Sequence, residues 1–156
     1  MNDEATYQSV APRHLQRFDR TEALRLLGTV SLGRIVFTHQ ALPAVRPVNH
    51  FLDGENIIVR LHDGATLTAI VAPTDAAGVV VAYEADVIDP RTHLGWSVVV
   101  TGYAHRVTDA HDLARYAGTL QPWMRHDAMN AALRIEPDLV TGSRLTVEPM
   151  IPAHPA

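Results

Sequence analysis

The chain has 156 residues, and 13 basic against 17 acidic residues give it a formal charge of −4. All of the basic residues are arginine and cysteine is absent, which excludes disulfides, thiolate metal sites and a cysteine nucleophile. With 47% hydrophobic and 19% charged residues, the composition is that of one globular domain with a hydrophobic core.

Charge and hydropathy also bear on the protein's location and on its possible binding partners. No apolar run reaches the roughly 18 to 20 residues that a membrane-spanning helix needs, and residues 1–14 lack the layout of a signal peptide. The arginines are dispersed along a mildly acidic chain, whereas binding to nucleic acid depends on clustered cations. We therefore expect a cytoplasmic protein that binds neither nucleic acid nor membranes.

Three segments are expected along the chain. Residues 1–18 show no hydrophobic periodicity and are predicted to form a loosely held arm. Residues 19–148 are predicted to form the folded domain. Residues 149–156 contain three prolines and are predicted to form a tail.

The domain is predicted to open with a short helix. Asp19 is a candidate N-cap, and Glu22 three residues later completes the pattern of a capping box. The apolar face of the helix is formed by leucines, and Gly28 stands where a C-cap is expected.

Three strands are predicted next, at 34–38, 44–51 and 56–61, with a loop over 39–43. The dipeptide Asp-Gly at 53–54 favours a tight turn between the second and third strands. Pro47 cannot donate a hydrogen bond to a sheet, so its stretch should be an edge or a bulge whose backbone is available to a ligand.

After the third strand, a short helical segment and two long strands are predicted. A short helix is predicted at 65–71, and two long valine-rich strands at 78–88 and 95–107 should have both faces covered. Gly102 indicates a bend or bulge in the second of them.

The last elements are helices at 109–118 and 123–133 and a strand at 139–147. The sum is an α+β domain, mainly β, with about six antiparallel strands in a barrel and short flanking helices.

One junction has the chemistry of a phosphate site. The strand that ends at Arg60 passes through Gly64 into a predicted helix whose first turn carries Thr66 and Thr68. Unpaired amides at a helix start, a threonine hydroxyl and a planar guanidinium can together hold a phosphate. Arg60 could equally be an exposed residue at a strand end, and Thr66 an ordinary N-cap.

The other candidate residues are weaker. Nine histidines occur, but none has the spacing of a metal site on a helix, so we expect no bound metal. His50 follows the irregularity at Pro47 and is a candidate to face a ligand and act as a catalytic residue. No nucleophile motif or dinucleotide-binding glycine motif is present.

Six motifs follow one another between residues 32 and 144. They are Leu-Gly-Arg-Ile-Val at 32–36, Pro-Ala-Val-Arg-Pro-Val-Asn at 43–49, Asp-Gly-Glu-Asn-Ile-Ile-Val-Arg at 53–60, Gly-Ala-Thr-Leu at 64–67, Gly-Trp-Ser-Val-Val-Val-Thr-Gly at 95–102 and Val-Thr-Gly-Ser-Arg at 140–144. Their order resembles the pyridoxamine 5′-phosphate oxidase-like, FMN-binding split-barrel family, and looks closest to its nitroimidazole-resistance-type branch. The resemblance covers residues 19–148, and the Gly-Trp-Ser segment is its most specific element.

The resemblance implies a six-stranded split barrel that forms a homodimer, with two flavin sites between the subunits. Carried over by position, one group of residues would border the flavin ring, mainly through backbone groups, and a second would hold the phosphate. A third group would complete the cleft from the strand or from the partner subunit. The three groups are Arg46, Pro47, Val48 and Asn49 for the ring; Arg60, Gly64, Ala65, Thr66 and Leu67 for the phosphate; and Trp96 and Arg144 for the completion of the cleft.

One position departs from the family pattern. The family usually places a lysine in the turn after the strand-end arginine, and this chain has Leu67 there. The phosphate would then be held by Arg60, Thr66 and backbone amides alone.

The function implied by the resemblance is that of an FMN-dependent oxidoreductase. It would move electrons between a nicotinamide donor or oxygen and a small organic substrate. Two alternatives stay open: a reductase that uses a deazaflavin cofactor, and a non-catalytic protein that carries or senses flavin or haem.

Overall fold

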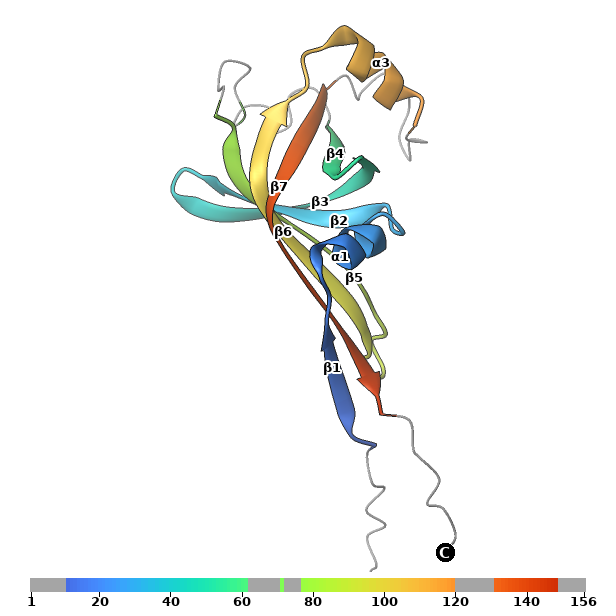
Figure 1. Ribbon diagram of the computed structural model, residues 1–156. Helices are drawn as coiled ribbons and strands as arrows, with labels where there is room; N and C mark the ends of the chain where they lie inside the picture. Colours follow the sequence, from blue (N-terminus) through green and yellow to red (C-terminus); the bar gives the residue numbers. More distant parts are fainter. Residues whose placement is uncertain (1–10, 62–70, 72–76, 120–130, 149–156) are drawn as a thin grey trace, which may run out of the picture.

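The computed structural model describes residues 11–61, 71, 77–119 and 131–148, and this part of the chain contains seven strands and two helices (Figure 1). None of these helices has the length and apolar character needed to cross a membrane. In chain order the elements are β1 (Arg13–Arg17), α1 (Arg20–Leu27), β2 (Leu32–His39), β3 (Leu42–Asp53), β4 (Asn56–Leu61), β5 (Val79–Ile88), β6 (Gly95–Arg106), α3 (Ala110–Ala117) and β7 (Ala131–Val147).

Six of the strands close into a ring. The order is β4, β3, β2, β5, β6 and β7, and β7 also pairs with β4. All of the pairings are antiparallel, and β1 lies outside the ring as a partner of β7. The predicted split barrel, mainly β with short helices, is confirmed.

The core of the barrel follows from the alternation of side chains along each strand. Ile35 and Phe37 of β2, Tyr83 of β5, and Val98 and Val100 of β6 are buried on the inner face. The valine-rich runs predict that both faces of β5 and β6 are covered, and for the outer face of the single chain this prediction is wrong. Val80 is 61% exposed and Val99 38% exposed, so these strands have one covered face within a single chain.

Helix α1 packs against β6 and β7 and adds leucines to the core. Asp19 is the predicted N-cap, and its carboxylate accepts a hydrogen bond from the backbone N–H of Glu22 at 2.8 Å. The Glu22 carboxylate does not return to the N-cap. It binds Arg25 with two hydrogen bonds of 2.8 Å, so only half of the predicted capping box forms.

The connection between β2 and β3 is tighter than the predicted loop over 39–43. His39 pairs with Leu42, so Gln40 and Ala41 alone form the turn. Their φ angles are 50° and 63°, the left-handed values of a two-residue hairpin turn. Gln-Ala lacks the Asn or Gly that usually indicates such a turn, and the sequence therefore did not reveal it.

Pro47 lies where a proline can be accommodated. On one side β3 pairs with β2, with Pro47 opposite Arg34. On the other side the ladder with β4 begins only at His50, so the stretch around Pro47 is an edge within the described residues. The predicted edge at Pro47 is confirmed.

Two segments form strands that were not predicted. Residues 13–17, inside the predicted arm, pair with β7 as strand β1. Strand β7 begins at residue 131 and not at 139, so residues 131–133 are wrongly predicted as helix. Pairing with β4 outweighs the local helix preference of the Ala-Ala-Leu segment there. Residues 65–70, most of 123–133 and the tail 149–156 lie outside the described residues.

Gly102 stands at the predicted irregularity in β6. The register with β7 shifts between Thr101 and Gly102, and Asp138 is the extra residue on the partner strand. A Cβ atom at Gly102 would collide with the backbone carbonyl oxygen of Glu136. The close approach of two backbones therefore requires glycine at this position.

We expect Gly102→Ala to lower the free energy of unfolding by about 2 kcal/mol or more, because backbone atoms must move to admit the methyl group. Gly118→Ala is the matched control. Gly118 has a helical φ of −80°, and among the described residues its Cβ would meet only the Arg115 carbonyl oxygen, at 3.8 Å. In urea denaturation, the free energy of unfolding of the control should stay within about 1 kcal/mol of the wild-type value. Equal losses of stability in the two variants would contradict this explanation of Gly102.

Candidate functional site

The paired ends of β3 and β4 bring two groups of predicted site residues together. The β3–β4 ladder ends at the pair of His50 and Val59. Asn49 and Arg60 are the next residues on the two strands, so they lie side by side just beyond the ladder. Arg60 is half-buried and lies opposite Ala132 of β7. The predicted phosphate turn, Gly64, Ala65, Thr66 and Leu67, follows Arg60 in sequence but lies outside the described residues.

The edge of β3 offers backbone groups as well as side chains. Arg46 and Pro47 are exposed, while Val48 packs against the core. The Arg46 guanidinium donates a hydrogen bond to the Val45 carbonyl at 2.9 Å. Since no strand of the described chain pairs with this side of β3 before His50, its N–H and C=O groups can bind the polar rim of a planar ligand.

Trp96 and Arg144 form a second group, directly opposite each other on β6 and β7. Trp96 is 9% exposed and packs in the main core. The Arg144 guanidinium lies over the ring of Phe18, 5.3 Å from its centre. This cation–π contact anchors Arg144 beside the start of α1.

The structure separates the two groups within one chain. Arg60 is opposite Ala132, and Arg144 lies twelve residues further along the same strand. At the rise of an extended strand this is roughly 40 Å. Figure 1 shows β7 running from the end covered by α3 to the end where β1 lies. Arg60 and Arg144 of one chain therefore cannot contact the same small ligand.

A hollow that the sequence did not reveal lies at the Arg144 end. It has a volume of about 230 Å³, and its lining includes Arg17, Ser97 and Ser143. These three residues form one row across β1, β7 and β6. The row depends on the pairing of β1, for which the sequence carries no periodic signal.

His50 is a core residue. It is 1% exposed, and both ring nitrogens have partners inside the chain: Nε2 donates to the Leu27 carbonyl at 2.9 Å, and Nδ1 lies 2.6 Å from the Tyr83 hydroxyl. The carbonyl can only accept, so in the neutral ring Nδ1 accepts the hydrogen bond from Tyr83. The suggestion that His50 faces a ligand is therefore wrong, because both nitrogens are already used.

Burial controls the charge of this pair. It lowers the pKa of His50 and raises that of Tyr83, because both charged forms lose their hydration in the core. Gly33 makes room for the pair, since a Cβ there would overlap the Tyr83 ring. The neutral His50 and Tyr83 act as a buried polar link between β3, β5 and the end of α1.

Comparison with known proteins identifies the family. The family model for pyridoxamine 5′-phosphate oxidase matches residues 19–144. The chain belongs to this family.

Several proteins are similar to this pyridoxamine 5′-phosphate oxidase family member in sequence or in structure. Uncharacterized protein Rv0080 of Mycobacterium tuberculosis is 48% identical over 140 residues, which cover 90% of this chain and 91% of that protein. An FAD-binding protein of Mycobacterium smegmatis is 27% identical with a TM-score of 0.62, covering 84% of this chain and 98% of that one. A Bacteroides thetaiotaomicron structure of the 5-nitroimidazole antibiotic resistance type has a TM-score of 0.64 at 11% identity, covering 87% and 90%.

Within this family member, we expect His50 to make stability depend on pH. The unfolded chain binds a proton at His50 near pH 6.5, whereas the folded chain resists protonation to lower pH. The contribution of the neutral ring is complete above about pH 6.5 and is lost as the pH falls toward the lowered pKa. Urea denaturation at pH 7.5 and pH 5 should show the loss.

His50→Gln supplies the comparison for that experiment. This variant should be less stable at both pH values but should lose less stability between them, because the buried titrating group is gone. An equal pH-dependent loss in wild type and variant would show that other groups cause it.

Proposed function

We propose that the protein binds FMN at a site shared between two copies of the chain and acts as an oxidoreductase on a small organic molecule. The observation that carries the proposal is the juxtaposition of Arg60 with the unpaired edge of β3. The similarity to an FAD-binding protein at 27% identity supports a flavin as the ligand.

Arg60 and the neighbouring edge of β3 have the chemistry to bind the two parts of FMN, its phosphate and its flavin ring. Arg60 supplies a planar, permanently charged donor for the phosphate. The edge of β3 from Arg46 to Asn49 supplies backbone donors and acceptors for the polar rim of the flavin ring. Bound flavin would supply the electron-transfer chemistry, while the chain binds it, orients it and limits its contact with water.

The proposed second copy of the chain explains how Trp96 and Arg144 can take part. Because Arg60 and Arg144 are roughly 40 Å apart along β7, a flavin that uses both must lie between two subunits. In a twofold dimer the same surface of each chain contacts its counterpart, so such sites come in pairs.

The outer face of the barrel offers a surface for this contact. One row of outward residues crosses five strands, from Val45 and Val36 through Ala82 and Thr101 to Leu139. Val45 is 49% and Leu139 59% exposed, and the row contains no charge. An uncharged row with exposed apolar side chains at both ends favours an interface with a second copy.

A carrier without catalytic activity is the second candidate. The core position of His50 favours it, because His50 is the catalytic candidate in the sequence and its ring is buried and hydrogen-bonded within the chain. Oxidation of NADH or NADPH by the flavin-loaded protein would support the enzyme, and stable bound flavin without turnover would support the carrier.

We expect purified protein to bind FMN, with a flavin spectrum between roughly 300 and 500 nm. Arg60→Gln should raise the dissociation constant for FMN about 10- to 100-fold, because one charge-assisted contact to phosphate is lost. Arg25→Gln, which removes an exposed arginine from α1, is the control and should bind like wild type. FAD and a deazaflavin cofactor, titrated in parallel, test the alternative ligands.

No binding of any flavin by the wild-type protein would overturn the proposed function. Unchanged FMN affinity in Arg60→Gln would show that the phosphate is held elsewhere.

We expect Leu139→Glu to convert the dimer to a monomer at micromolar concentration, because it places a charge in the apolar row. Light scattering after size-exclusion chromatography measures the mass. Thr21→Glu, an exposed position on α1, is the matched control and should stay dimeric. A monomeric wild-type protein that still binds FMN would contradict the shared site.

A further inference from the structure

Helix α3 lies at the end of the barrel where β6 ends and β7 begins (Figure 1), and side chains on one side of it pack against β3, β4 and β7. Tyr116, on its inner side, is 1% exposed and packs with Ile58, Val107 and Ala132 in a cluster separate from the main core. The ring of Phe51 meets the Tyr116 ring edge-on, 5.4 Å between centres. The helix is therefore attached through an apolar contact of its own.

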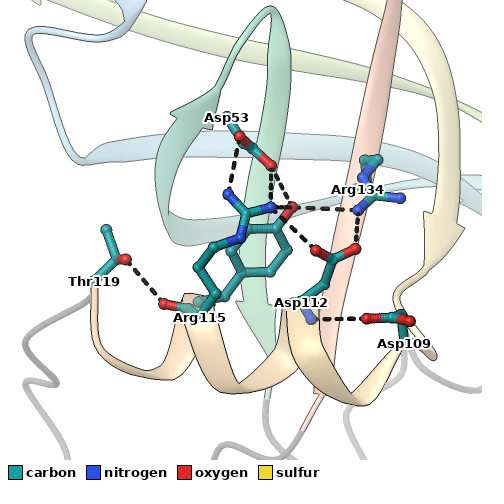
Figure 2. A network of polar contacts seen from close by, with 7 residues as sticks. Asp53, Asp109, Asp112, Arg115, Thr119 and Arg134 are labelled. Carbon is teal, nitrogen blue, oxygen red and sulfur yellow. Dashed lines mark hydrogen bonds and ion pairs between the residues drawn. The ribbon is translucent and has the colours of Figure 1, made fainter.

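A ring of polar contacts surrounds this apolar contact (Figure 2). Arg115 reaches both carboxylate oxygens of Asp53, at 2.9 and 3.3 Å, and one oxygen of Asp112 at 3.1 Å. Arg134 of β7 donates to the other Asp112 oxygen at 3.0 Å. The two carboxylates and two guanidinium groups balance, and the attractive contacts hold the pKa values of both aspartates below their usual range, mainly through Arg115.

The Tyr116 hydroxyl joins the two sides of this ring. It donates to Asp53 at 2.5 Å and accepts from Arg134 at 3.2 Å. Asp53 is the last residue of β3, and Arg134 lies on β7 opposite Ile58 of β4. One side chain of α3 therefore connects the end of β3 to β7 across β4.

Arg60 is a close neighbour of residues that pack against Tyr116 of α3. Ile58 and Arg60 are two residues apart on β4 and so project from the same face of the strand. Ala132, the residue opposite Arg60, belongs to the cluster that contains Tyr116. A shift of α3 would therefore move the strand pair that carries Arg60.

We propose that α3 positions Arg60 for phosphate, with Tyr116 and Asp53 as positioning residues, so that the helix determines the preference for a phosphorylated over an unphosphorylated flavin. The inference rests on the proposed function, because it assigns a cause to the phosphate contact of that site. It goes beyond that function by placing part of the ligand specificity in residues outside the binding cleft.

Tyr116→Phe and Asp53→Asn test the inference with little change in shape. Tyr116→Phe keeps the apolar packing and the ion pairs of Arg115 and Arg134 but removes the hydroxyl that joins them. Asp53→Asn keeps the volume and removes the charge at the β3 end. Arg25→Gln, which loses one surface ion pair of α1, is the matched control.

The readout is the pair of dissociation constants for FMN and for riboflavin, measured by flavin fluorescence on each protein. We expect Tyr116→Phe and Asp53→Asn to weaken FMN binding roughly 3- to 10-fold, with riboflavin affinity within about twofold of wild type. Arg60→Gln should show the same selective loss to a greater degree. Circular dichroism establishes that each variant is folded.

The outcomes separate the two proposals. If wild type prefers FMN and Arg60→Gln abolishes that preference, but Tyr116→Phe and Asp53→Asn retain it, the positioning role is wrong and the proposed function stands. Equal weakening of FMN and riboflavin by these two variants also overturns the positioning role, because a general loss of structure would have that effect. Absence of flavin binding in the wild type overturns both.

Discussion

Strand β7 is the element on which the rest of the molecule depends. It pairs with β4 at its start, with β6 along most of its length and with β1 near its end, and its pairing with both β4 and β6 closes the ring. The extra residue Asp138, opposite the register shift at Gly102, interrupts β7, and such an irregularity bends and twists a strand. Because Arg60 and Arg144 are both fixed through β7, this strand also sets the distance between the two groups of candidate site residues.

Two polar networks have different roles in the barrel, one in its core and one on its outside. His50 and Tyr83 lie in the core, are fully hydrogen-bonded and neutral, and connect β3 and β5 to the end of α1. Such a buried pair specifies one arrangement of the core, because displacement would leave polar groups without partners. The network around Tyr116 lies on the outside, carries balanced charges and attaches α3 next to Arg60. The first stabilises the barrel, and the second is suited to position Arg60, the proposed phosphate ligand.

Much of the fold could be predicted because local signals agreed with it. The Asp-Gly turn, the valine-rich runs and the cap at Asp19 each specify structure over a few residues. The errors occur where long-range pairing decides. Strand β1 and the start of β7 have no strand pattern of their own and form because a partner strand is present. The core position of His50 could not be inferred either, since it depends on Tyr83, 33 residues away, and on Leu27.

Mixed dimers test most directly whether one flavin contacts Arg60 of one chain and Arg144 of another, as the proposed shared site requires. Arg60→Gln and Arg144→Gln should each bind FMN poorly alone. After unfolding and refolding of a one-to-one mixture, half of the dimers contain both variants, and each of these has one intact site. About one quarter of the wild-type FMN binding should then return. A mixture that binds no more FMN than the separate variants, or an Arg144→Gln dimer with wild-type affinity, would contradict the account.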